Sequence, residues 1–395
     1  MSLIKIIFKQ IKVNTSSCFL LLPAFYMALM PWSIEESFNL NFLGYDMSLF
    51  FLIGCIALLI KKQKRKEGFV LFTLFFTFIS AILCFEGDVV GRYFIGIEFI
   101  LGYLFAKEIR YNDDIITIIH FASVLLLIAI LFQQISLTFG LGFIESGQEQ
   151  VLLSDGMLRV GTSVGSSTLT GILVVLILAI ILHTSKSILF DYISFALGTA
   201  SVLLSGTRSA MLILLLIGGL MLLGEKYRIS KFFKLLFIIV CIIYVMPFVT
   251  AIIEARNEVA GDSSDITSGR VERWIQAFKI FKESPLNYLF GVGPASVPIS
   301  MFNEHINPVA SPHNVYIGVL LEFGVFYTVV FIIFVFKKIL KYFSFRNIPS
   351  LVLLGSMLVS WNTEVVPLSF LYSFFFWLLF FLNVYNKNEY ENSIY

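Results

Sequence analysis

Three consecutive apolar runs between residues 164 and 224 decide the fold class. They read VGSSTLTGILVVLILAIILH (164–183), ILFDYISFALGTASVLL (188–204) and SAMLILLLIGGLMLLG (209–224). Each run is about long enough to cross a hydrocarbon core roughly 30 Å thick as an α-helix. Only the short polar segments TSKS and SGTR separate them. Apolar runs joined by such short turns are typical of neighbouring membrane-spanning helices.

The same pattern extends over the whole chain. Apolar residues make up 58% of its 395 residues and charged residues only 14%, which is outside the usual range of soluble domains. We predict an all-α, polytopic integral membrane protein that forms a single membrane domain over residues 1–395. About twelve spans are expected, at 16–33, 43–60, 68–85, 93–106, 115–137, 164–183, 188–204, 209–224, 235–253, 313–336, 348–361 and 370–385.

The distribution of charge predicts the orientation in the membrane. Cytoplasmic loops of membrane proteins retain Lys and Arg. If the N-terminus is inside, alternation of the twelve spans places 20 of the 28 Lys and Arg residues on one side. Both termini are therefore expected in the cytoplasm, with the N-terminal run retained as a first helix because no small-residue cleavage site follows it. Residues 254–312 then form one large outer loop, predicted to contain short helices.

The remaining composition excludes several classes of site. All four cysteines lie inside apolar runs, so the spacing predicts neither a disulfide framework nor a Cys/His metal centre. We expect no cofactor and no metal, because the outer side carries no Asp-x-Asp pair or histidine cluster. No nucleic-acid motif is present, and the inner basic clusters are explained by topology and by anionic membrane lipids. The four cysteines in apolar runs are Cys18, Cys55, Cys84 and Cys241.

Six of the eight cations expected on the outer side are arginines. A planar guanidinium grips phosphate or carboxylate in a bidentate way, so these arginines are candidate anion ligands. The alternative is pairing with loop carboxylates, which we favour for Arg92 and Arg256. Arg208 has almost no loop to carry it into water and must lie at the membrane surface, bound to a partner or snorkelling. The outer cations are Arg92, Arg159, Arg208, Arg256, Arg270, Arg273, Lys279 and Lys282.

The large outer loop is predicted to carry a helix over residues 270–282. Its apolar residues recur at helical spacing, and Ser284-Pro285 is expected to end it. Arg270, Arg273 and Trp274 lie at i, i+3 and i+4, so they can cover one neighbourhood. An interfacial helix whose arginines bind lipid phosphate is the alternative. Residues 291–294, GVGP, are expected to form a turn, with only a weak signal for a phosphate cradle.

His313 opens the tenth apolar run. An imidazole at the mouth of a span can move a proton near neutral pH. Read as one helix at 100° per residue, Tyr316 shares the face of His313. Glu322 then points the opposite way, roughly 13 Å deeper, so we expect a structural role for that carboxylate.

Three motifs together resemble the O-antigen polymerase and ligase superfamily of bacterial inner-membrane glycosyltransferases. Residues 208–212 fit an Arg-x-x-x-Leu signature. The pattern of the family's large periplasmic loop is matched by Gly269-Arg270, Trp274, Ala277, Pro285 and residues 291–294. The third signature begins at His313-Asn314 and continues, after nine intervening residues, with Gly324 and then Tyr327. The motifs cover about 120 residues within the C-terminal two thirds, whereas the first 150 residues match only in being hydrophobic helices. We favour a polymerase because polymerases are the more numerous members.

The resemblance implies metal-independent transfer of a glycan from an undecaprenyl-diphosphate carrier to an acceptor hydroxyl, on the periplasmic face. In a polymerase the acceptor is another lipid-linked repeat unit, and in a ligase it is the lipid A core. His313, Arg208 and Arg270 are the expected catalytic residues. The family pattern usually needs a single arginine in the large loop, and here both Arg270 and Arg273 are candidates for that position. The expected substrate-binding residues are Arg273, Arg159, Trp274, Asn314 and Tyr316.

Partners and other functions remain open from the sequence. The resemblance implies an undecaprenyl-diphosphate-linked oligosaccharide as substrate, and a chain-length regulator protein is a candidate partner. A polysaccharide transporter or flippase with twelve helices is a further alternative. It predicts charged, interrupted helices at the midplane of both halves, whereas the polar residues singled out above cluster at one membrane face. A non-catalytic scaffold is the last alternative.

Overall fold

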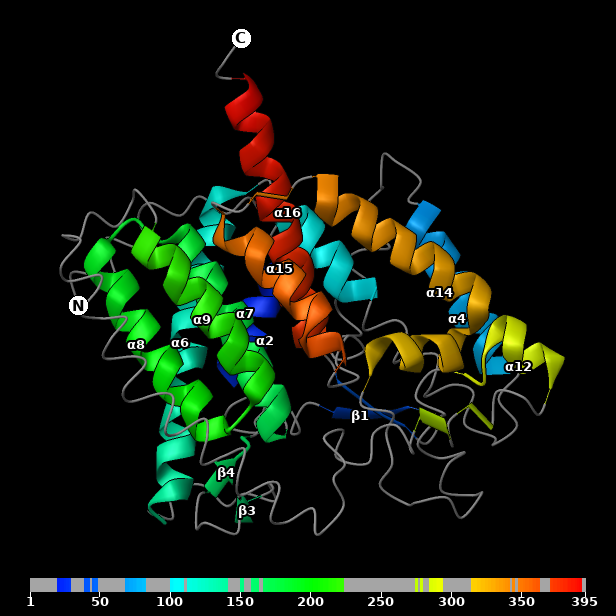
Figure 1. Ribbon diagram of the computed structural model, residues 1–395, viewed down its shortest axis with the longest axis horizontal. Coiled ribbons are helices and arrows are strands. Elements are labelled where there is room, and N and C mark those ends of the chain that lie inside the picture. The colour runs from blue at the N-terminus through cyan, green and yellow to red at the C-terminus, as the bar shows by residue number, and fades with distance from the viewer. Residues whose placement is uncertain are drawn as a thin grey trace.

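The computed structural model of the chain is a bundle of helices with two small hairpins (Figure 1). It describes residues 20–29, 39–42, 45–48, 68–82, 100–109, 112–140, 150–152, 158–162, 166–223, 274–275, 278–279, 284–293, 314–341, 343–344, 347–362 and 370–392. Its named helices are α2 (Leu22–Leu29), α4 (Gly68–Ile82), α6 (Asp113–Thr138), α7 (Ser167–Thr184), α8 (Ile188–Ser205), α9 (Arg208–Leu223), α12 (Pro285–Phe290), α14 (Val315–Lys341), α15 (Ile348–Leu358) and α16 (Phe370–Asn392).

The helices agree in position with most of the predicted spans. Within the described residues, α6, α7, α8 and α14 are long and apolar enough to cross a membrane, while α4, α9, α15 and residues 371–382 of α16 are shorter apolar helices. These eight segments coincide with predicted spans, and the chain is a membrane protein. The number of twelve spans stays a prediction, because residues 235–253, among others, lie outside the described part.

The fold is helical as predicted, with two short antiparallel hairpins in addition to the helices. β1 (Asn39–Phe42) pairs with β2 (Tyr45–Ser48), and β3 (Gln150–Leu152) pairs with β4 (Leu158–Val160). The predicted span 43–60 was therefore wrong in its first residues. Asn39, Asn41 and Asp46 interrupt the apolar residues in this stretch, and polar residues at alternate positions favour a strand over a helix.

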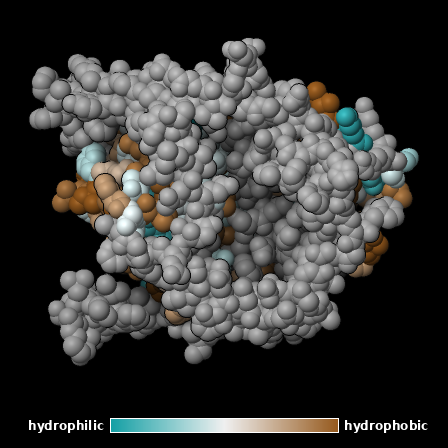
Figure 2. Space-filling view, turned by 90° about the horizontal axis from the view of Figure 1, so that it is seen from below, coloured by the Kyte–Doolittle hydropathy of each residue, from teal (hydrophilic) through white to brown (hydrophobic). Residues whose placement is uncertain are grey.

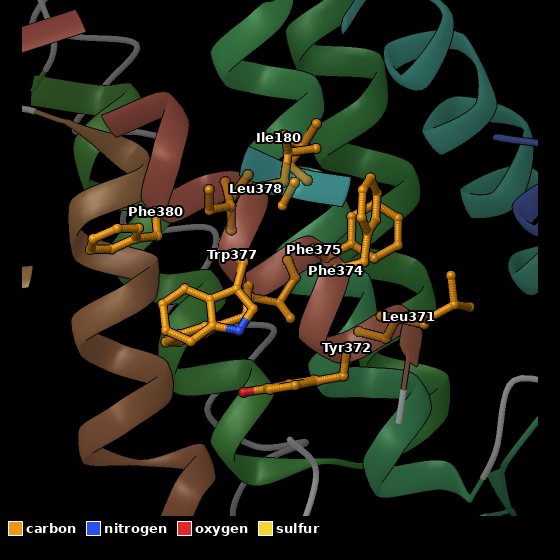
Figure 3. Packing of buried hydrophobic residues seen from close by; sticks show 14 of the residues in the cluster. Ile180, Leu371, Tyr372, Phe374, Phe375, Trp377, Leu378 and Phe380 are labelled. Carbon is orange, nitrogen blue, oxygen red and sulfur yellow. The ribbon is translucent and has the colours of Figure 1, made fainter. Parts of the chain in front are cut away.

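Helix α7 forms the centre of the bundle. Every residue from Ile172 to Leu182 is at most 2% exposed, and α7 contacts α6, α8, α9, α15 and α16. Figure 3 shows Ile180 of α7 beside Leu378 of α16, within a cluster that includes Trp377. A helix enclosed by other helices is apolar on all sides, which explains the uninterrupted sequence of α7.

The peripheral helices expose apolar stripes instead. On α6 the exposed residues recur at steps of three and four, the spacing of one helix face. In Figure 2, apolar side chains are visible at the edge where α6 and α8 lie and at the opposite edge near α4 and α14. Exposed stripes of this kind are stable against lipid tails, as expected for membrane spans. The stripe on α6 consists of Phe121, Leu125, Ile128, Phe132 and Ile135.

Helix α14 is broken, which corrects the prediction of a single straight span over 313–336. Gly324 has φ 78° and ψ 176°, so the helical path stops and restarts there. In Figure 1 the part before Gly324 runs across the long direction of α7, and the two parts meet at an angle beside α12 and α4. The calculated depth of Glu322 assumed one axis through the bilayer and therefore does not apply.

Candidate functional site

The predicted site residues fall into three groups. Arg208, Trp274, Asn314 and Tyr316 lie in the described part of the structure. Arg159 lies in β4, where its backbone pairs with Val151 of β3. The other three, His313, Arg270 and Arg273, lie outside the described residues, so the approach of the histidine to the arginines stays a prediction.

Arg208 is the first residue of α9 and is half-buried. Gly206 ends α8 in the left-handed conformation, with φ 61°, so the chain reverses direction within the two residues before Arg208. The N-terminal end of a helix carries positive partial charge, which disfavours a cation there by roughly 0.3–1 kcal/mol. Both the guanidinium and the helix end therefore favour an anion at this position.

The turn before Arg208 is fixed to the N-terminal end of α7. Thr207 Oγ1 donates a hydrogen bond of 3.0 Å to the carbonyl of Ser167, and Ser205 Oγ donates to Thr207 Oγ1 at 3.1 Å. Gly171 of α7 permits the close approach, since a Cβ there would lie 2.8 Å from Thr207 Cβ. A glycine in contact with small hydroxyl residues is a common way to bring membrane helices together.

The end of strand β4 reaches the same turn of α7. The hydroxyls of Thr162 and Thr170 are hydrogen-bonded at 3.2 Å, and both residues are fully buried. Thr170 and Gly171 are consecutive residues of α7. One of them therefore contacts the segment that carries Arg159, and the other contacts the turn that carries Arg208.

The start of α14 is fixed by its own polar residues. Asn314 is buried, and its Oδ1 accepts a hydrogen bond of 3.0 Å from the amide of Ile317, so this side chain caps the helix. The hydroxyl of Tyr316 donates to the carbonyl of Met357 in α15 at 2.9 Å. Its ring packs edge-on against Trp361. Contact of Asn314 or Tyr316 with substrate stays a prediction, but the side-chain oxygen of each already has a structural bond.

Helix α15 connects the start of α14 with the helix that carries Arg208. Gly355 lies two residues before Met357, and a Cβ there would lie 3.3 Å from Ile213 Cγ1 of α9. Ile213 lies five residues after Arg208. The chain that immediately follows His313 and the helix that begins with Arg208 are therefore held at the same end of α15.

The segment predicted as the large outer loop packs against α14 and α4 through α12. Ser284 Oγ accepts a hydrogen bond of 3.2 Å from the amide of Leu286, and Pro285 is the first residue of the helix. The same dipeptide that was expected to end one helix thus begins another. Residues 274–275 and 278–279 are helical, and Trp274 is half-buried.

The two residues Val292 and Gly293, which follow α12, donate hydrogen bonds to α14 just before its break. The amide of Val292 donates to the carbonyl of Leu321 at 2.8 Å, and the amide of Gly293 donates to the carbonyl of Glu322 at 3.1 Å. These two amides satisfy carbonyls at the helix break, so they do not form the phosphate cradle considered from the sequence. Ser80 of α4 also donates to the Glu322 carbonyl. Sequence reasoning missed this junction, although Gly324 was part of a motif.

Comparison with known proteins adds one match. Residues 193–332 match the family model described as O-antigen ligase. This range contains the Arg208 signature, the outer-loop motif and the His313 signature, and it confirms the resemblance to the polymerase and ligase superfamily drawn from them. The match does not distinguish a polymerase from a ligase. No curated protein matches the chain.

Proposed function

We propose that this chain, which carries a domain of the O-antigen polymerase and ligase superfamily over residues 193–332, transfers a glycan from a polyprenyl diphosphate to an acceptor hydroxyl. One observation carries the proposal. The Arg208 turn and the strand that carries Arg159 contact consecutive residues of α7. The start of α14, directly after His313, adjoins the same bundle through α15.

The proposed reaction needs groups that stabilise a leaving diphosphate. As the bond between the anomeric carbon and phosphate oxygen breaks, negative charge develops on the diphosphate. Arg208 and Arg270 are the groups we propose to stabilise it, with Arg273 and Arg159 as further ligands. Fixed guanidiniums in a poorly hydrated site are effective because no solvent must reorganise around the new charge.

The acceptor hydroxyl must lose its proton while it attacks the anomeric carbon. We propose that neutral His313 accepts this proton, because imidazole titrates close to neutral pH. The new glycosidic bond forms, the diphosphate departs as an anion, and the imidazolium returns the proton to water. Trp274 is the proposed stacking surface for a sugar ring, with Asn314 and Tyr316 at the entrance to α14.

Glycan polymerisation is the form of transfer we propose, with another lipid-linked repeat unit as the acceptor. The polyprenyl tail of the donor lies in the bilayer, against the apolar outer faces of the helices. The proposed location is the bacterial inner membrane, with both termini in the cytoplasm and the site on the periplasmic face. A ligase would use the same arginines and histidine on a different acceptor.

A deletion strain analysed by gel electrophoresis of its surface polysaccharide tests the acceptor. Lipid A core carrying a single repeat unit indicates a lost polymerase. Bare core with accumulated lipid-linked polymer indicates a lost ligase. Unchanged lipopolysaccharide, together with unchanged capsule and unchanged lipid-linked intermediates, would contradict the proposed transfer. Complementation with Arg208→Ala should reproduce the deletion, while Lys186→Ala, in the turn between α7 and α8 at their other end, should restore the wild-type pattern.

A further inference from the structure

A buried amide on α6 links two helices to the strand that carries Arg159. Gln134 is fully buried. Its Nε2 donates to the carbonyl of Ser201 in α8 at 3.1 Å and, over a longer 3.5 Å, to the carbonyl of Val160 in β4. Ser201 Oγ donates to Gln134 Oε1 at 2.6 Å. Gln134 thus has polar partners on both neighbouring elements.

The bond to β4 is the informative part of this network. A buried amide is costly unless its donors and acceptor are satisfied, and apolar contacts alone would suffice to pack α6 on α8. The pair formed with Ser201 uses one amide donor and the amide oxygen. The second donor is directed at β4, the second strand of the β3–β4 hairpin, and the Val160 side chain is fully buried.

The Val160 carbonyl that Gln134 binds lies next to Arg159. Val160 directly follows Arg159, and two residues further on Thr162 is bonded to Thr170. The segment 160–162 is therefore held at both ends, at Val160 by α6 and at Thr162 by α7. Gly171 of α7, next to Thr170, holds the turn before Arg208. The two arginine-carrying segments share one support.

We infer that Gln134 is a positioning residue that fixes the β4 strand so that Arg159 and Arg208 bind the diphosphate of the lipid-linked donor together. This inference rests on the proposed function and adds a buried support for Arg159, one of the ligands proposed there. Arg159 would contribute to binding of the diphosphate before and during transfer. Gln134 itself touches no substrate and acts only through the strand.

Enzyme kinetics of the full-length protein in membrane vesicles test this inference. Gln134→Met keeps the length of the side chain and removes both donors. We expect an increase of about tenfold in KM for the polyprenyl-diphosphate-linked repeat unit, with kcat within about twofold, because uniform binding of the diphosphate is weakened. Arg159→Ala should show the same division between KM and kcat. Ser194→Ala, which removes a buried hydroxyl two turns away on α8, is the matched control and should leave both constants unchanged.

A double-mutant cycle separates positioning from general packing. If Gln134 acts through Arg159, the Gln134→Met/Arg159→Ala variant should have the KM of Arg159→Ala alone. If the increases in KM of the two single variants multiply in the double variant, the inference is overturned. An unchanged KM in a Gln134→Met protein that accumulates to the wild-type level would also overturn it. Should Gln134→Met fail to accumulate, Ser201→Ala removes one bond of the same network and must raise KM by a smaller factor; an unchanged KM there also overturns the inference.

Failure of the proposed function would look different. In that case wild-type vesicles would not extend the lipid-linked repeat unit, or Arg208→Ala would be as active as wild type. Active wild type, inactive Arg208→Ala and unaffected Gln134 variants would instead contradict only the role of Gln134.

Discussion

Gly291 packs against the backbone just before Gly324, and Gly324 packs against the backbone just before Gly291. A Cβ on Gly291 would overlap the carbonyl of Glu322, and a Cβ on Gly324 would overlap the carbonyl of Leu289. Both residues have positive φ, 80° and 78°. The end of α12 and the break in α14 are therefore one interlocked junction.

This junction predicts a large effect of the smallest substitution. Gly324→Ala adds a methyl group where the backbone of α12 lies and imposes a conformation that costs roughly 1–3 kcal/mol for a residue with a Cβ. We expect a lower thermal unfolding temperature in detergent and loss of transfer activity. Gly219→Ala in α9 is the matched control, since a Cβ there meets nothing within 4 Å. Equal unfolding temperatures for the two variants would contradict the junction.

The support beneath Arg208 gives a second prediction. Gly171→Ala places a Cβ 2.5 Å from Ser205 Oγ and 2.8 Å from Thr207 Oγ1, so the turn before Arg208 must move. Displacing a catalytic group by about 1 Å can cost on the order of 10²-fold in rate. We expect transfer activity to fall far more than membrane abundance. Gly68→Ala has open space and should be neutral; a fully active Gly171→Ala would show that the position of this turn does not matter.

Arg208 itself gives a third prediction. Arg208→Ala removes the guanidinium at the start of α9 that we propose to stabilise the diphosphate, and loss of one such donor typically lowers kcat by about 10²–10³-fold. Arg208→Lys should recover activity only in part, because a point charge lacks the planar fork. The measurement is the rate of glycan transfer in vesicles, normalised to protein abundance. Full recovery with lysine would mean that the position requires charge alone.

The sequence predicted the spans well where polar caps bound an apolar run. Asn112, Ser166 and Ser187 cap α6, α7 and α8, and the predicted boundaries differ from the observed ones by three residues or fewer. The break in α14 was not predicted, because a glycine inside an apolar run does not by itself stop a helix. It depends on amides of Val292 and Gly293, which come from a segment about thirty residues earlier.

The candidate site was predictable to a different extent. The location of Arg208 followed from the short segment between two apolar runs. Its support on Gly171 and the link from Gln134 to β4 had no local sequence signal, since both depend on which helices become neighbours. The contacts of His313 stay a prediction, because residues 294–313 lie outside the described part of the structure.

His313 and Glu322 give the last prediction. Glu322 is 3% exposed, and its carbonyl accepts hydrogen bonds from Gly293 and Ser80 at the break in α14. The prediction from the sequence that Glu322 points away from His313 stays a prediction, because His313 lies outside the described residues. We expect His313→Ala to abolish glycan transfer with normal abundance, because the base proposed for the acceptor hydroxyl is removed. Glu322→Gln keeps the shape of the side chain and should retain most of the activity. Equal loss of transfer rate in the two variants, at equal abundance, would place the carboxylate in the reaction and change the assignment of the base.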